Sequence, residues 1–135
     1  MKKTGKDKYD IVIIGGGPAG CSAAKFLSGK YKILMVDRLK FPRTKTCGGL
    51  LVEESQSFLE KFYKKPPENV FSQPKYLNLK IVDWNNNIEK SFKRKIWNVS
   101  RKNFDKWLLE QTRNSVCFFS RTSFLGFRQN KKTRK

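Results

Sequence analysis

The sequence predicts an α/β fold with a parallel sheet and an inserted β-hairpin or meander, and three observations predict it. An apolar run at residues 11–14 leads straight into a Gly-x-Gly-x-x-Gly turn and a helix-forming segment. A second strand-like run at residues 32–36, apolar from Ile33 onward, ends at Asp37. Residues 76–82 then alternate between apolar and polar side chains, which is typical of a strand. The first two observations together describe a Rossmann-like β-α-β core.

The glycine turn has the layout that seats the pyrophosphate of a dinucleotide. Gly15 permits the tight turn after the strand, Gly17 lets phosphates approach the backbone, and Gly20 lets the helix pack near the sheet. Pro18 and Ala19 open the helix, and Pro suits a first helical turn. The helix start offers N–H groups and a partial positive charge to an anion.

The context of the turn agrees with this interpretation. Residues 11–14 are continuously apolar, as expected of a strand buried on both faces. A helix follows, with Gly29 as its stop, and then the second strand. Asp37 lies 17 residues after Gly20, near the position where an acidic residue binds ribose hydroxyls. The alternative interpretation of Asp37 is a solvated strand end. The alternative interpretation of the glycine motif is an ordinary turn between two core elements.

The rest of the chain is divided by its breaker residues and periodicities. The expected elements are a loop over 38–50, a helix over 52–63, strands over 76–82, 88–92 and 96–99, a helix over 101–113 capped by Ser100, and a third parallel strand over 116–119. The expected domains are a basic tail at 1–8, a partial dinucleotide-binding domain at 9–127 with an insertion at about 66–99, and a disordered basic tail at 128–135.

Composition narrows the function classes. The chain has 30 Lys and Arg against 11 Asp and Glu, a net charge of +19, which favours nucleotide phosphates, an anionic membrane surface or nucleic acid as partners. The alternative is a solvated basic surface. With no histidine, His-based catalysis is excluded and no metal site is predicted. Three widely separated cysteines favour a reduced cytoplasmic setting, and no stretch approaches a transmembrane span.

Two further segments, Phe41–Gly49 and Ser100–Leu108, make a specific resemblance visible. Together with the glycine turn and the Asp37-Arg38 pair, they resemble the geranylgeranyl reductase family of FAD-dependent oxidoreductases, which has the p-hydroxybenzoate hydroxylase type of flavin fold. The resemblance runs from about residue 9 to 127. Its Phe-Pro-Arg…Cys-Gly-Gly segment favours FAD over NAD as the bound dinucleotide.

The resemblance implies roles for matching residues. Asp37 would take the adenosine ribose, with Arg38 near the adenine, while the glycine turn would hold the FAD pyrophosphate. Arg101 would reach the FAD phosphate or ribitol region. The flavin side would be lined by four residues, Arg43, Cys47, Gly48 and Gly49, where two adjacent glycines bring backbone close to a flat ring.

Each of these roles has an alternative. Arg43 would otherwise be a solvated loop cation, and Arg101 an ordinary first-turn residue. Cys47 is the one catalytic candidate, and its alternative is a small residue that fits a tight loop. Cys21 and Cys117 are expected to be packed in the core.

Members of the resembled family are longer and carry a second flavin motif with Gly-Asp, a pair absent from this sequence. The chain is therefore expected to be a truncated or split piece, which binds flavin weakly or not at all and does not turn over alone. A complementing C-terminal fragment is the expected partner. Co-expression with the neighbouring reading frame, followed by measurement of flavin content, would test this.

The resemblance implies an enzyme that reduces double bonds of isoprenoid (geranylgeranyl) chains, with a reduced nicotinamide or a ferredoxin as electron donor. Alternatives are an FAD-dependent monooxygenase and a non-catalytic nucleotide-binding subunit of a split flavoprotein. The expected location is cytoplasmic, with peripheral contact to an anionic membrane. Nucleic-acid binding is disfavoured because the three tryptophans do not interleave with basic residues in a recognised module.

Overall fold

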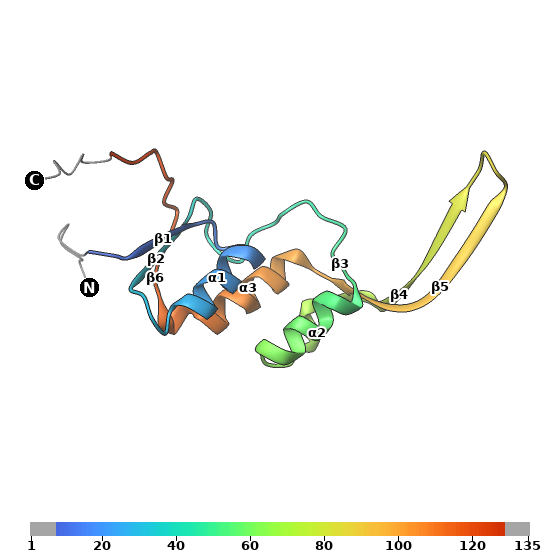
Figure 1. Cartoon of the computed structure of the whole chain (residues 1–135), viewed down its shortest axis with the longest axis horizontal. Helices are drawn as coiled ribbons and strands as arrows, with labels where there is room; N and C mark the ends of the chain where they lie inside the picture. The colour runs from blue at the N-terminus through green and yellow to red at the C-terminus, as the bar shows by residue number, and fades with distance from the viewer. Residues whose placement is uncertain (1–7, 129–135) are drawn as a thin grey trace, which may run out of the picture.

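The computed structural model describes residues 8–128. It contains a parallel sheet with two helices, a second sheet drawn out into a long hairpin, and a third helix beside the junction (Figure 1). The elements in chain order are β1 (Ile11–Ile14), α1 (Pro18–Leu27), β2 (Ile33–Asp37), β3 (Leu50–Leu51), α2 (Glu53–Phe62), η1 (Glu68–Val70), β4 (Phe71–Asp83), β5 (Ile88–Val99), α3 (Arg101–Thr112), η2 (Arg113–Ser115) and β6 (Cys117–Ser120). The predicted α/β class is confirmed.

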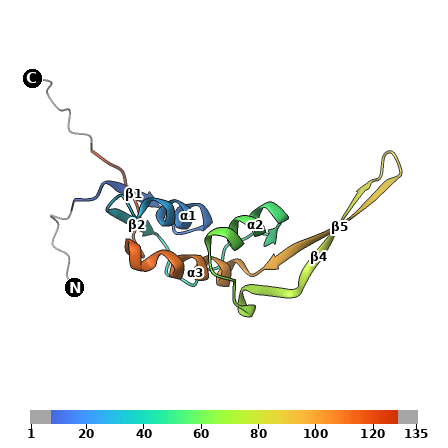
Figure 2. The same ribbon diagram turned by 60° about the horizontal axis from the view of Figure 1, so that its bottom comes forward.

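The parallel sheet has the order β1-β2-β6, so the strand before the glycine turn and the last strand flank a central β2. Met35 pairs with Ile13 on one side and Phe118 on the other. Helices α1 and α3 lie side by side against this sheet (Figure 2). Their buried side chains join Met35 in one hydrophobic core, which includes Cys21, Ala24, Phe104, Trp107 and Leu108. This core fixes the carboxyl ends of the strands, where the candidate site lies.

The expectation that residues 11–14 are buried on both faces is wrong. Val12 is 50% and Ile14 is 58% exposed, while Ile13 packs against the core. The reason is that β1 is an edge strand and only its Ile13 side faces the helices. A continuous apolar run does not indicate how many helices cover the sheet, so it could not predict which face of β1 is exposed.

The predicted hairpin is present but longer than expected. The segments 88–92 and 96–99, expected as two strands, form the single strand β5, which pairs antiparallel with β4 and, at its end, with β3. The residues between the two predicted segments, 93–95, include no Gly or Pro. The polar residues there do not interrupt the strand. The turn over 84–87 is confirmed, and Asn87 has the left-handed φ of 56° that Asn tolerates.

The helix boundaries follow the sequence closely. Phe58 and Phe62, which are four residues apart on α2, have ring centroids 5.1 Å apart. Ser100 does precede α3, but its hydroxyl makes no capping hydrogen bond, and its carbonyl instead accepts the N–H of Phe104 at 2.8 Å. Apart from Lys8 and Arg128, the predicted terminal tails lie outside the described residues. Within residues 8–128, no helix is both long and apolar enough to cross a membrane.

Candidate functional site

The glycine turn is held in place by backbone hydrogen bonds to the end of β2. The Gly15 N–H donates to the Val36 carbonyl at 2.8 Å, and the buried Gly16 N–H donates to Asp37 Oδ2 at 2.9 Å. Helix α1 begins at Pro18. Among the residues that the structure describes, no side chain caps this helix, and its first turn contains no acidic residue. The positive end of the helix therefore faces the turn without an acidic residue in its own first turn, and the nearby carboxylate of Asp37 is bound to the Gly16 N–H.

Two glycines of the turn differ in what a side chain would meet. A Cβ at Gly20 would run into the Gly15 carbonyl oxygen, so α1 can cross β1 this closely only because residue 20 has no side chain. A Cβ at Gly17 would meet only Arg43 Nη2, at an ordinary 3.5 Å. The space beside Gly17 is therefore free of the backbone and open to a group that approaches the helix start.

Asp37 lies where the ribose-binding residue was predicted, but it is largely buried. It is 6% exposed, and each of its carboxylate oxygens accepts a backbone N–H: Oδ2 from Gly16 and Oδ1 from Leu39, the latter at 2.9 Å. The carboxylate therefore shapes the glycine turn as well as facing the crevice. Each carboxylate oxygen has a second lone pair, so these bonds leave acceptor capacity for a hydroxyl donor.

A cleft of about 660 Å³ opens at the carboxyl ends of β1 and β2. It brings together four predicted site residues, Gly15, Asp37, Arg38 and Arg43. The remaining wall comes from the loop after β2 and the segment after β6, including Thr44, Lys45, Thr46, Thr122 and Ser123. Ligands of open α/β sheets bind in this position, outside the carboxyl ends of the strands.

Arg43 is not the solvated loop cation that the sequence left open. Its side chain is 9% exposed, with Nη1 3.2 Å from Asp105 Oδ2 and Nε 3.6 Å from Asp37 Oδ2. The guanidinium also lies over the Phe41 ring, 4.7 Å from its centroid. On the other side of Asp105, Arg101 donates through Nε at 2.8 Å and Nη2 at 3.1 Å. Two guanidiniums and two carboxylates thus form one buried, charge-balanced cluster.

Asp105, which is fully buried, is the site residue that sequence reasoning missed. Its only signal in the sequence was the i,i+4 spacing from Arg101 on a predicted helix. Its pairing with Arg43 joins residues 62 apart in the chain, and no local pattern indicates such a contact.

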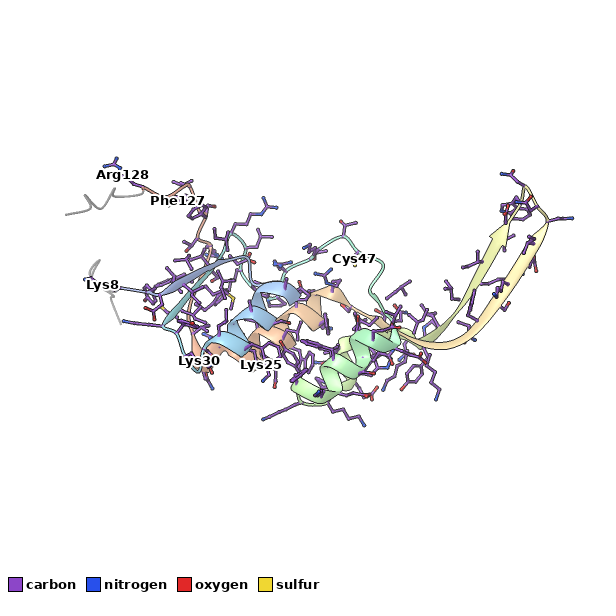
Figure 3. The ribbon with its side chains drawn as sticks, viewed as in Figure 1. Lys8, Lys25, Lys30, Cys47, Phe127 and Arg128 are labelled. Atoms are coloured by element: carbon purple, nitrogen blue, oxygen red, sulfur yellow. The ribbon has the colours of Figure 1, made fainter. Side chains whose placement is uncertain are left out.

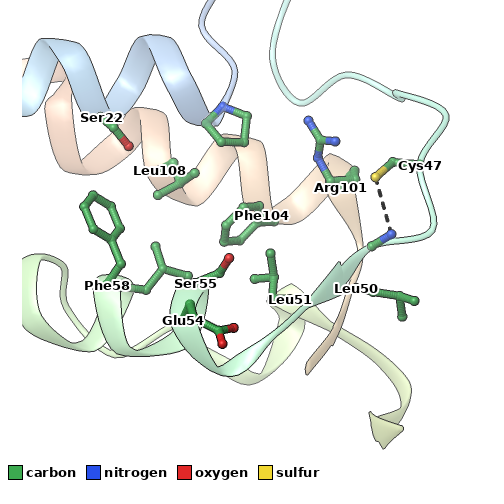
Figure 4. Close-up of a pocket in the computed structure, with 13 residues that line it drawn as sticks. Ser22, Cys47, Leu50, Leu51, Glu54, Ser55, Phe58, Arg101, Phe104 and Leu108 are labelled. Atoms are coloured by element: carbon green, nitrogen blue, oxygen red, sulfur yellow. Dashed lines mark hydrogen bonds between the residues drawn. The ribbon is translucent and has the colours of Figure 1, made fainter. Parts of the chain in front are cut away.

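A second cavity of about 390 Å³ lies between α1, α2 and α3 (Figure 4). Apolar side chains such as Leu51, Phe58, Phe104 and Leu108 line most of it, and Pro18 at the start of α1 is part of its wall. Cys47 and Arg101 lie next to each other at one end. The loop that follows β2 therefore contributes to both cavities, and the helix start lies between them.

Cys47 is an exposed thiol on that loop (Figure 3). Its Sγ accepts the Gly49 N–H at 3.5 Å, and this bond, with the neighbouring Arg101 guanidinium, lowers the pKa of Cys47 below its ordinary value. Gly49 has φ of +70°, and a Cβ there would strike the Val99 carbonyl oxygen. Only glycine allows the tight turn that presents this N–H to the thiol.

Other predicted residues lie elsewhere. Ala19 and Gly48 are exposed, and neither belongs to the lining of the two cavities as residues 8–128 form them. Cys21 is fully buried, as predicted, and burial raises its pKa to about 12. Cys117 is half-buried in β6.

The sequence of this chain is similar to a known protein family and to curated proteins. The model of the pyridine nucleotide-disulphide oxidoreductase family matches residues 9–123. Protein CbrA of Escherichia coli O139:H28 is 31% identical over 114 residues, which are 82% of this chain and 32% of CbrA. The chain thus spans about a third of the length of the curated relatives it matches.

Solved structures share the fold. A geranylgeranyl bacteriochlorophyll reductase-like protein from Thermoplasma acidophilum superposes with a TM-score of 0.72 at 20% identity, covering 91% of this chain and 32% of that one. A flavoprotein/dehydrogenase from Cytophaga hutchinsonii gives a TM-score of 0.66 at 27% identity, covering 90% and 33%. A mutant of the halogenase PltM, in complex with FAD, gives 0.63 at 14% identity, covering 92% and 30%.

Proposed function

The chain belongs to the pyridine nucleotide-disulphide oxidoreductase family, and we propose that it is the FAD-binding portion of a flavin-dependent oxidoreductase. One observation carries this proposal. Gly15 at the start of the glycine turn, Asp37 and Arg38 line a single cleft at the carboxyl ends of β1 and β2. A dinucleotide needs this combination: bare backbone for its phosphates and an acidic group for its ribose.

The residues present fit the adenosine diphosphate half of FAD. The open space beside Gly17 and the uncapped start of α1 would receive the pyrophosphate. Asp37 would accept from ribose hydroxyls with its remaining lone pairs, and the exposed Arg38 would lie near the adenine. The buried Arg43 lies beside Asp37 and offsets its negative charge. This lowers the electrostatic repulsion between the carboxylate and a phosphate placed close to it.

The second cavity would lie on the flavin side of the site. Arg101 and Cys47 stand at its end nearest the loop, and Gly49 brings its backbone close to them. We propose that Arg101 positions the phosphate or ribitol region. The cluster with Asp105 would hold the Arg101 guanidinium in one orientation. FAD, when bound, would supply hydride transfer, while these residues would bind and orient it.

The finer proposal is a reductase of isoprenoid double bonds that accepts electrons from a reduced nicotinamide or a ferredoxin, in the cytoplasm. The resemblance of Phe41–Gly49 and Ser100–Leu108 to the geranylgeranyl reductase family supports it. An FAD-dependent monooxygenase is the competing reaction on the same cofactor. Residues 9–127 would form the partial FAD-binding domain, with 66–99 as an insertion.

A second candidate is a non-catalytic nucleotide-binding subunit that works with a separate polypeptide. What supports it is the same cleft, whose described lining offers groups for a nucleotide, Gly15, Asp37 and Arg38. Flavin content restored on co-expression with a complementing C-terminal fragment would support the split enzyme.

Equilibrium dialysis against FAD tests the proposed function, because it detects weak as well as tight binding. Gly17→Ala should fold, since its Cβ would make only an ordinary contact, and yet should weaken FAD binding about ten-fold or more by crowding the pyrophosphate. Gly29→Ala is the matched control, because its Cβ would meet open space. Equal FAD binding by the two variants would argue against the site.

A further inference from the structure

One carboxylate oxygen of the buried cluster serves two cations. Asp105 Oδ2 lies 3.2 Å from Arg43 Nη1 and also accepts a hydrogen bond from Arg101 Nη2 at 3.1 Å. The three side chains are buried or nearly so by segments of this chain itself. Because two like charges share one acceptor at short range, anything that draws one guanidinium away strengthens the pairing of Asp105 with the other.

The two guanidiniums belong to different cavities. Arg43 lines the cleft at the carboxyl ends of β1 and β2, and Arg101 lines the cavity between the helices. Nε and Nη1 of Arg43 approach the two carboxylates, whereas its Nη2 lies 3.5 Å from the position that a Cβ at Gly17 would take. That position is next to the start of α1, where a diphosphate would bind. A diphosphate there would come within reach of Arg43.

Arg101 lies beside the thiol of Cys47 at the end of the second cavity (Figure 4). The Gly49 N–H and then Arg101 lower the pKa of Cys47, while the charge of Asp105 acts in the opposite direction. Glu54 of α2 is the other acidic residue in the described lining of this cavity. Closer pairing of Arg101 with Asp105 would leave less positive charge beside the sulfur, and the thiolate fraction would fall.

We propose that Asp105 is a positioning residue shared by the two cavities, through which a diphosphate bound at the start of α1 makes the Cys47 thiol less reactive. The inference rests on the proposed nucleotide site. The diphosphate attracts the Arg43 guanidinium, and Arg43 then releases part of Asp105 Oδ2. Asp105 pairs more closely with Arg101, and the thiolate of Cys47 loses part of its stabilisation.

The rate at which iodoacetamide alkylates Cys47 across a pH series tests this in the full chain. The ligand is ADP, which carries the diphosphate but no flavin that could cover the thiol. At saturating ADP and constant ionic strength, the profile should move to higher pH, and the rate at neutral pH should fall about two-fold or more. The plateau at high pH should not change, since only steric cover would lower it. Adenosine, which has no phosphates, should leave the profile unchanged.

Variants on α3 separate the path through Asp105 from a direct effect of the bound phosphates. Asp105→Asn keeps the shape of the side chain but removes its charge, so ADP should lose most of its effect on Cys47. Glu110→Gln is the matched control, because it removes a carboxylate from an exposed position on the same helix and should keep the full effect. Arg101→Gln should also abolish the effect, and it serves if Asp105→Asn does not fold.

Equilibrium dialysis with ADP, run on every variant, keeps the two proposals distinguishable. Binding of ADP that leaves the Cys47 profile of the parent chain unchanged would overturn this inference and leave the nucleotide site intact. Absence of ADP binding would overturn both. An equal effect of adenosine, a lowered plateau, or a full ADP effect in the Asp105 or Arg101 variant would overturn the coupling alone.

Discussion

Arg43 Nη1 lies 3.2 Å from Asp105 Oδ2, and this contact ties the loop after β2 to helix α3 inside the protein. Both side chains are buried, Asp105 completely. The contact fixes the path of this loop. The loop carries Cys47 and lines both cavities. The geometry of the candidate site is therefore set by a buried ion pair between segments far apart in the chain.

Removal of Arg43 should destabilise the fold strongly. Arg43→Leu would leave Asp105 with Arg101 alone and Asp37 with no cationic partner among its described contacts. Loss of one partner of a buried pair costs about 3–5 kcal/mol. Urea denaturation would measure the change in the free energy of unfolding.

Lys106→Ala is the matched control for that variant. Lys106 Nζ lies 3.6 Å from Glu110 Oε1 on the same helix, but both side chains are about half exposed. Such a pair contributes about 0–1 kcal/mol, so this variant should unfold almost like the parent. A similar loss of stability in both variants would contradict the buried-cluster account.

Gly20 should tolerate no side chain. In Gly20→Ala the new methyl group would run into the Gly15 carbonyl oxygen, so either α1 or the turn must move. Such overpacking costs about 1–3 kcal/mol and would also displace the phosphate-binding backbone. Thermal unfolding and FAD dialysis should both show a loss, whereas Gly29→Ala should show none. Parent-like behaviour of Gly20→Ala would mean that the turn is not packed as described.

Cys47 should react as an activated thiol. The Gly49 N–H and then Arg101 lower its pKa, so its thiolate fraction at neutral pH exceeds that of an ordinary cysteine, and alkylation should reach half its maximal rate at a lower pH. Cys21 should stay unmodified, since burial raises its pKa to about 12. Mass spectrometry of the two cysteine peptides after a pulse of iodoacetamide would follow both rates.

Arg101→Gln separates the two causes of the low Cys47 pKa. The alkylation profile should move to higher pH but stay below that of a free cysteine, because the Gly49 hydrogen bond remains. Circular dichroism would establish that the variant is folded. A profile identical to that of the parent chain would show that Arg101 does not act on the thiol.

Sequence reasoning worked where the signal is local. The glycine turn, α1 and the end of β2 at Asp37 are encoded within one short segment, and the structure has them at the expected positions. It failed where the outcome depends on distant segments. The exposure of Val12 follows from how many helices cover the sheet, and the role of Asp105 follows from a loop that passes over α3. Neither has a local pattern.

The most direct test of the proposed nucleotide site is an amide NMR titration of the folded chain with ADP, the half of FAD that the turn and Asp37 would bind. Saturable shifts should be centred on the amides of the glycine turn and the helix start, Gly15, Gly16, Gly17, Ala19 and Gly20, and on that of Arg38, with those of the β4–β5 hairpin unchanged. Shifts confined to the hairpin or to scattered lysines, without saturation at the glycine turn, would contradict the account.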